Sequence, residues 1–200
     1  SGPLRMGIIG LGAGTLAAYG RSGDTLRFYE LNPLVMNIAR RQFTYLADCP
    51  AHIDVVPGDA RLTMSQEEPQ HFDILVVDAF SGDAIPVHLL TREAFFIYWR
   101  HLKPNGVLIV HVSNLYLNLA PVVRLAADEA GKLAWQVNNN ADDLKEVYGA
   151  SYVLVSSRPG FFTNYVFWRR LLPIAVPRHL REWTDDYSSL WQIIELRRPK

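Results

Sequence analysis

The sequence has one cysteine, no excess of charge of either sign and no long hydrophobic run. Cys49 alone cannot form an intrachain disulfide, which excludes a disulfide scaffold and fits a reducing compartment, so we predict a cytoplasmic protein. The 20 Lys and Arg residues balance the 20 Asp and Glu residues, so no global positive field would attract nucleic acid. No apolar run approaches the roughly 18 residues that span a bilayer, so we expect this stretch to be soluble.

The order of apolar and helical patterns predicts the fold. With 200 residues, 49% of them hydrophobic, the chain can close one sizeable core, and we predict a single domain, residues 1–200. Short β-branched runs alternate with helical patterns, which is typical of a parallel sheet covered by helices. The predicted strands are 6–10, 26–30, 53–56, 73–78, 106–112, 133–137 and 151–156. The clearest predicted helices are 33–47, 88–102 and 119–131.

The four central strands are nearly uninterrupted apolar runs, as expected of strands buried on both faces. We therefore predict an α/β fold: a three-layer sandwich with a Rossmann-like, seven-stranded, mostly parallel sheet. Its core covers residues 5–157, and residues 158–200 form a C-terminal aromatic appendage. Because a strand begins almost at once, at Met6, truncation from a longer protein remains an alternative.

Three glycines follow the first predicted strand, at Gly10, Gly12 and Gly14. They allow backbone amides to converge where a ligand can approach closely, because these positions lack a Cβ. A dinucleotide fingerprint would place its third glycine at Thr15, so the spacing fits G-x-G-x-G better. The alternative is a tight turn between a strand and a helix.

Two carboxylates and a small residue support a nucleoside site. Glu30 ends the second predicted strand, twenty residues after Gly10, where its two oxygens can accept from both ribose hydroxyls. Asp59 and Ala60 follow the third strand, and Asp59 can accept from an exocyclic adenine amine. Asp59 also suits the N-cap of a helix, and the two roles can coexist.

Asp78 ends the fourth predicted strand and is the candidate base. In a doubly wound sheet the crevice opens where strand order reverses, which is expected between strands one and four, so Asp78 should face the glycine loop. Partial burial would make it a better base than a surface aspartate; the alternative is that Asp78 caps the next turn. Asp83 can steer a cationic substrate or serve a turn. His111 is interpreted as a core residue or as part of the same rim.

The C-terminal region carries Asp185 and Asp186 between Trp183 and Tyr187. Two carboxylates beside aromatic rings can hold an alkylammonium group by charge and cation–π contact, which makes Asp185, Asp186 and Tyr187 substrate-binding candidates. The alternative is a terminal helix beginning near Asp185 and packed through Trp191, Ile193 and Ile194. No His/Cys cluster has metal-ligand spacing, so we expect no metal.

With these motifs in order, the chain resembles the spermidine synthase (polyamine aminopropyltransferase) family, which is built on the class I fold of S-adenosylmethionine-dependent methyltransferases. The resemblance covers residues 6–115, through the glycine loop and the segments RFYELNP, GDAR, FDILVVDAFSGDAIP and LTREAFFIYWRHLKPNGVLIVHVSN. The chain is most similar to bacterial spermidine-synthase-like domains that often follow a membrane-transporter-like segment. Those domains also have a WTDDYS segment near their C-terminus, as this chain has at residues 183–188. The resemblance therefore implies a membrane-transporter-like segment as an upstream partner if the chain is truncated.

The resemblance implies a transferase of polyamine biosynthesis. It places Glu30 on the ribose, Asp59 with Ala60 near the adenine, and Asp78 as the general base. The implied reaction moves an aminopropyl group from decarboxylated S-adenosylmethionine to a small-molecule amine, a polyamine. A homodimer is a further possibility, since the aromatic C-terminal residues can cover a sheet edge or form an interface.

Three departures from the family leave other functions open. Ala13 stands where the family has an aspartate that grips the aminopropyl ammonium. The second aspartate of the D-S-S-D-P motif is missing or displaced to Asp83, and the N-terminal β-hairpin part is not in this chain. The alternatives are a methyltransferase that uses intact S-adenosylmethionine and a catalytically silent nucleoside-binding domain.

Overall fold

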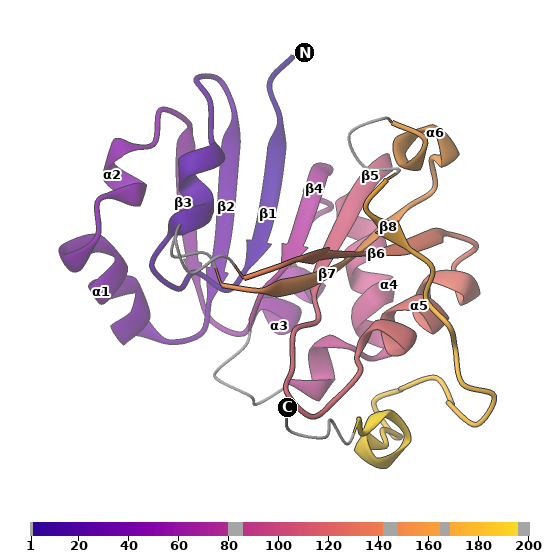
Figure 1. The fold of residues 1–200 in the computed structure, drawn as a ribbon. Helices are drawn as coiled ribbons and strands as arrows, with labels where there is room; N and C mark the ends of the chain where they lie inside the picture. The colour runs from indigo at the N-terminus through magenta and orange to yellow at the C-terminus, as the bar shows by residue number, and fades with distance from the viewer. Residues whose placement is uncertain (1, 80–85, 142–147, 165–168, 196–200) are drawn as a thin grey trace. The chain divides into compact units, whose positions relative to one another are not determined.

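The computed structural model describes residues 2–79, 86–141, 148–164 and 169–195. The chain divides into two compact units, one made of Ser1–Phe80 with Ile97–Gly106 and the other of Ser81–Phe96 with Val107–Lys200. Its strands form one sheet in the order β3-β2-β1-β4-β5-β7-β6-β8 (Figure 1). This mostly parallel sheet confirms the predicted fold class, with eight strands instead of seven.

The first unit contains four parallel strands joined by short helices. Strand β1 pairs on one side with β2 and on the other with β4, so the strand order reverses beside β1. In chain order its elements are β1 (Arg5–Ile9), η1 (Thr15–Tyr19), β2 (Thr25–Glu30), α1 (Pro33–Gln42), α2 (Tyr45–Asp48), β3 (His52–Pro57), α3 (Ala60–Gln66) and β4 (Phe72–Val77).

The core of this unit forms where side chains from neighbouring strands meet. Ile8, Phe28, Phe72 and Leu75 are at most 2% exposed. Gly7 is required beside Phe72, because a Cβ at Gly7 would lie 2.6 Å from the phenyl ring. Close packing of this kind fixes how β1 meets β4.

The second unit is built around antiparallel pairs. Strand β7 runs antiparallel to both β5 and β6, and β8 runs antiparallel to β6. Its further elements are η2 (Val87–Leu89), α5 (Ala120–Glu129), β6 (Leu133–Asn139), β7 (Ala150–Ser156), α6 (Pro159–Phe162), β8 (Leu171–Leu172) and η4 (Leu190–Ile193). Helix α4 (Arg92–His101) and strand β5 (Leu102–His111) contribute residues to both units.

The seven predicted strands are all present within a few residues, and several helix boundaries differ. The predicted helix 33–47 is two helices, because Phe43 is extended, with φ −128° and ψ 154°. Its start is as predicted: Pro33 is the first helical residue, and Asn32 Oδ1 accepts from Leu34 N at 2.9 Å. The predicted helix 88–102 begins only at Arg92. The two-residue strand β8 was not predicted, because it is too short to show a periodicity.

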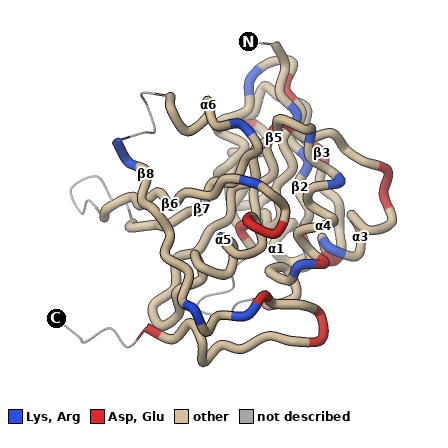
Figure 2. The backbone as a smooth tube through the Cα atoms, turned by 90° about the vertical axis from the view of Figure 1, so that its right-hand side faces the viewer, with Lys and Arg blue, Asp and Glu red and all other residues tan. Residues whose placement is uncertain are grey.

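Charges of both signs are interspersed along the described backbone (Figure 2). Arg27 in β2 is half-buried and pairs with Asp54 of β3 and Glu67 after α3. Tyr29, 1% exposed, donates to Glu67 Oε2 at 2.9 Å, and burial is the first cause that raises the pKa of its hydroxyl. This polar network ties α3 to the sheet. Within the described ranges, no helix has the length and apolar character needed to cross a membrane.

His101 ends α4 and is completely buried. Its Nε2 lies 2.8 Å from the carbonyl oxygen of Met64, and its Nδ1 accepts from Gln70 N at 3.3 Å. These partners require a neutral ring with the proton on Nε2. Burial lowers the pKa of His101, and the charge of Arg100 acts in the same direction.

We expect His101 to make stability depend on pH. Because its pKa is lowered in the folded state, its contribution is complete above the unfolded value of about 6.5 and is lost as the pH falls below it. The free energy of unfolding from urea titrations should therefore fall more between pH 7 and 5 in the wild type than in His101→Gln, by at most about 1.4 kcal/mol per pH unit. The exposed control His52→Gln should keep the wild-type slope, and equal slopes in all three proteins would contradict this role for His101.

Candidate active site

The candidate site residues of the first unit follow the carboxyl ends of its four parallel strands. The register pairs Ile9 with Tyr29 and with Val77, and Glu30 with Pro57. Backbone hydrogen bonds continue this register past the strands: Gly10 N donates to Tyr29 O, Gly58 N to Glu30 O, and Asp78 N to Ile9 O, each at 2.9 Å. The sheet therefore brings residues from four separate segments to one edge.

The glycine loop depends on backbone conformations that favour glycine. Gly10, Gly12 and Gly14 have φ values of 98°, 53° and 84°. At Gly10 the requirement is also spatial, because a Cβ would collide with the carbonyl oxygen of Asp78. At Gly12 nothing lies within 4 Å of the Cβ position, so this part of the loop is open to an approaching molecule. The structure thus has the tight turn of the one interpretation and the open loop that the ligand-binding interpretation needs.

Glu30 holds the glycine loop with its carboxylate. Its Oε2 accepts from Leu11 N at 2.9 Å, and its Oε1 accepts from Asn32 N at 2.8 Å. A carboxylate has about four lone-pair sites, so each oxygen retains capacity for another donor. Glu30 is half-buried, and its orientation is set by these two amides before any ligand binds.

Asp59 is a helix cap in this structure. Its Oδ1 accepts from Leu62 N at 2.9 Å at the start of α3, which confirms the capping interpretation. Ala60 is the first residue of that helix and is 7% exposed. Contacts of Asp59 and Ala60 with an adenine stay predictions.

Exposed leucines beside the site were not predicted from the sequence. Leu31 directly follows Glu30 and is 69% exposed, and Leu62 in the first turn of α3 is 64% exposed. Exposed leucines occur on most surfaces and carry little meaning singly. The sequence feature that could have indicated these leucines is their position, since each follows a candidate polar residue by one to three places.

Asp78 and Asp83 belong to the segment after β4. Asp78 is half-buried, and its backbone lies against Gly10 through the close approach described above. Asp83 lies outside the described residues. The roles of both aspartates stay predictions.

The WTDDY segment, residues 183–187, is anchored to the start of α4 in the second unit. Trp183 is 1% exposed, and its carbonyl oxygen accepts from Arg92 N at 2.8 Å. Asp185 accepts from Thr91 Oγ1 at 2.9 Å and donates through its backbone to Glu93 Oε2 at 3.0 Å. Asp185 therefore has structural partners.

Both aromatic rings of this segment already have partners within the protein. The Trp183 ring is buried, and the Arg181 guanidinium lies 4.2 Å from the centre of the Tyr187 ring. Amine binding by Asp185, Asp186 and Tyr187 stays a prediction. The alternative of a helix beginning near Asp185 was wrong: Thr184 and Tyr187 bond to each other in a turn, and η4, a short 3-10 helix, begins at Leu190. Trp191 is 86% exposed instead of packed.

No protein-family model matches the sequence. A polyamine aminopropyltransferase of Vibrio vulnificus (strain CMCP6) is 35% identical over 125 residues, which is 57% of this chain and 40% of that protein. An N-terminal histidine N-methyltransferase of Emericella nidulans is 33% identical over 111 residues, 52% of this chain and 19% of that protein. A probable spermidine synthase from Corynebacterium glutamicum superposes with a TM-score of 0.59 at 23% identity, over 78% of this chain and 56% of that one.

The chain is thus similar in sequence to polyamine aminopropyltransferases over about half its length, and its fold is that of spermidine synthases and methyltransferases. It spans 40% of the length of the Vibrio relative and 19% of that of the Emericella relative, so their activities do not transfer to it as a whole. The structural likeness, at 23% identity, concerns the fold alone.

We expect Asp185 to stabilise the fold. Asp185→Ala removes the acceptor of Thr91 Oγ1 and should lower the free energy of unfolding by about 1 kcal/mol. The neighbouring variant Asp186→Ala is a matched control, because Asp186 is also exposed and also acidic. Urea denaturation of both variants measures the difference, and an equal loss in the two would contradict a specific role for Asp185.

Proposed function

We propose that the first unit binds an S-adenosylmethionine-type nucleoside and that the protein transfers an aminopropyl group from decarboxylated S-adenosylmethionine to a small amine. The observation that carries this proposal is the carboxylate of Glu30, held against the glycine loop by Leu11 N and Asn32 N. Further support is the likeness to a protein named polyamine aminopropyltransferase.

In this proposal, Glu30 accepts hydrogen bonds from the two ribose hydroxyls. Its remaining lone pairs are available on both oxygens, and vicinal hydroxyls match their spacing. The base would lie against the exposed side chains of Leu31 and Leu62, which would shield them from water. Asp59 would accept from the exocyclic amine while its Oδ1 caps α3.

The proposed reaction is an in-line displacement. The lone pair of a neutral amine nitrogen attacks the methylene carbon next to the sulfonium, the carbon–sulfur bond breaks, and its electron pair stays on sulfur. The products are methylthioadenosine and an alkylated ammonium, whose extra proton passes to the Asp78 carboxylate. Since the sulfonium is already a good leaving group, the protein contributes mainly by positioning the amine and accepting its proton.

Ala13 favours a second candidate, methyl transfer from intact S-adenosylmethionine. Without an aspartate at this place, the loop has no negative charge to repel the carboxylate of that ligand. The Emericella relative is named a methyltransferase, which is consistent with this candidate. The two reactions differ in whether the bound donor has a carboxylate, so ligand preference separates them.

We expect decarboxylated S-adenosylmethionine and methylthioadenosine to bind in calorimetric titrations. Glu30→Gln should weaken both by about tenfold, or about 1.4 kcal/mol, because the neutral amide has one acceptor oxygen in place of two and can no longer accept from both Leu11 N and Asn32 N. Glu68→Gln is the control, because it removes the same negative charge at an exposed position outside the glycine loop. Unchanged affinity in Glu30→Gln would show that the ribose is placed wrongly. Tenfold tighter binding of intact S-adenosylmethionine would favour methyl transfer.

We expect Asp78→Asn to retain nucleoside binding and to lose turnover by about 100-fold or more, because the amide cannot take the proton. Product formation from a panel of polyamines, followed by mass spectrometry, measures this loss. The exposed Asp48→Asn is the control and should keep full turnover. An active Asp78→Asn would exclude Asp78 as the base. If the wild type forms no product although it binds the nucleoside, the domain is catalytically silent.

A further inference from the structure

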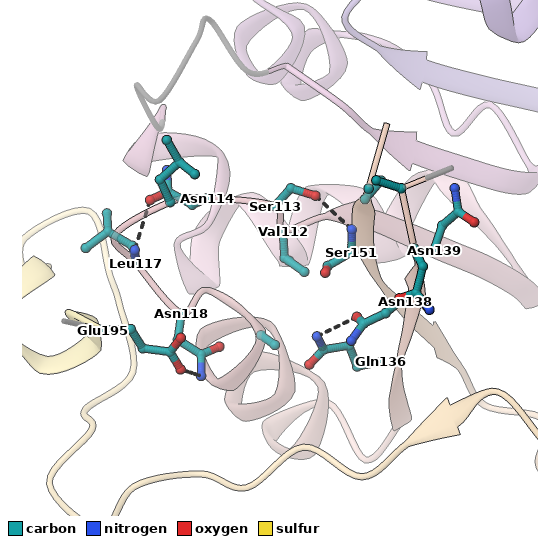
Figure 3. Close-up of a pocket in the computed structure, with 16 residues that line it drawn as sticks. Val112, Ser113, Asn114, Leu117, Asn118, Gln136, Asn138, Asn139, Ser151 and Glu195 are labelled. Atoms are coloured by element: carbon teal, nitrogen blue, oxygen red, sulfur yellow. Dashed lines mark hydrogen bonds between the residues drawn. The ribbon is translucent and has the colours of Figure 1, made fainter. Parts of the chain in front are cut away.

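A polar cavity of about 520 Å³ lies within the second unit and contains none of the residues of the proposed nucleoside site (Figure 3). A volume of this size is in the range of small-molecule binding sites. Its walls come from the segment after β5, the beginning of α5, the end of β6 and the beginning of β7, with Glu195 from the C-terminal region. Five of its lining residues are asparagines: Asn114, Asn118, Asn138, Asn139 and Asn140.

Hydrogen bonds of the backbone and of the Ser113 hydroxyl hold the walls of this cavity in place. Ser113 Oγ, which lies 2.7 Å from His111 Nε2, accepts from Ser151 N at 2.7 Å and joins the end of β5 to β7. The C-terminal segment runs beside residues 116–118, with Asn118 N bonded to Ile193 O at 2.7 Å and Glu195 N to Tyr116 O at 2.8 Å. The second of these bonds brings the Glu195 carboxylate to the cavity.

The first wall presents oxygen acceptors. Asn118 Nδ2 donates to Glu195 Oε1 at 2.7 Å. A carboxylate only accepts, so the amide of Asn118 must turn its nitrogen to Glu195, which leaves Asn118 Oδ1 available for a ligand. The second oxygen of Glu195 is available as well. Figure 3 shows this pair on one side of the cavity.

The opposite wall carries an amide pair. Gln136 Nε2 donates to Asn138 Oδ1 at 2.8 Å, which leaves one acceptor on Gln136 and one donor on Asn138 (Figure 3). Groups that both donate and accept, such as hydroxyls, match such a pair. No Lys, Arg, His or aromatic residue is among the described residues that line the cavity.

These features determine the ligand chemistry. An anion would lose its hydration without gaining a cationic partner, whereas an ammonium group would gain the Glu195 carboxylate and the Asn118 oxygen. A purely alkyl chain would face amides where it needs apolar surface. We propose that this cavity binds a hydroxylated primary amine in its ammonium form, of about the size of an amino sugar. The proposal goes beyond the transfer reaction and does not depend on it.

Calorimetric titration of the full chain at pH 6 with three probes tests the proposal. D-glucosamine should bind at least tenfold more tightly than D-glucose, which has the same ring without the charge, and than 1,5-diaminopentane, which has charge without hydroxyls. Equal binding of glucose and glucosamine would overturn the role of the ammonium. Tighter binding of the diamine would overturn the role of the hydroxyls, and no binding of any probe would overturn the site.

Variants locate the binding. Glu195→Gln should weaken glucosamine binding at least tenfold, and Asn138→Ala should weaken it severalfold. Glu129→Gln is the matched control in the same unit, because Glu129 is exposed at the end of α5 and does not line the cavity. Glu30→Gln should leave glucosamine binding unchanged, so a failure of this site and a failure of the nucleoside site are separate results. Equal effects of Glu195→Gln and Glu129→Gln would place the ligand elsewhere.

Discussion

The close approach of the backbone at Gly10 to the carbonyl of Asp78 is the constraint on which the candidate active site depends. Strand β1 pairs in parallel with both β2 and β4, so the chain must leave β1 in the space between two neighbouring strand ends. A Cβ does not fit there, and the positive φ of Gly10 turns the chain away from the sheet. The loop that results is open at Gly12 and follows β1 between the carboxyl ends of β2 and β4.

Glu30 couples this loop to the second strand. Its carboxylate satisfies the amides of Leu11 and Asn32, two donors that would otherwise need water at a half-buried edge. A ligand that binds Glu30 therefore meets a carboxylate whose position is already fixed, and little side-chain freedom remains to be lost on binding. The same residue thus has a structural and a proposed binding role, as Asp59 does at the start of α3.

The second unit uses its polar residues differently. Asp185 and its neighbours attach the C-terminal region to the first turn of α4, and Asn114 accepts from the amides of Tyr116 and Leu117 in the segment before α5. These bonds hold segments that lie outside the named strands and helices. Their arrangement leaves a cavity whose lining includes five asparagines, Gln136 and the Glu195 carboxylate.

The sequence by itself determined the order of strands and helices, the glycine loop and the carboxylates at strand ends, because these depend on local periodicity and on the adjacency of strand ends in a parallel sheet. Motifs read in order also indicated the similarity to spermidine synthases, which the comparisons support. Only the tertiary structure decided that Trp183 is buried, that Asp185 bonds to Thr91, and that Glu195 meets Asn118. Each of these contacts joins residues far apart in the chain, and no local pattern encodes which distant partner a polar side chain will find.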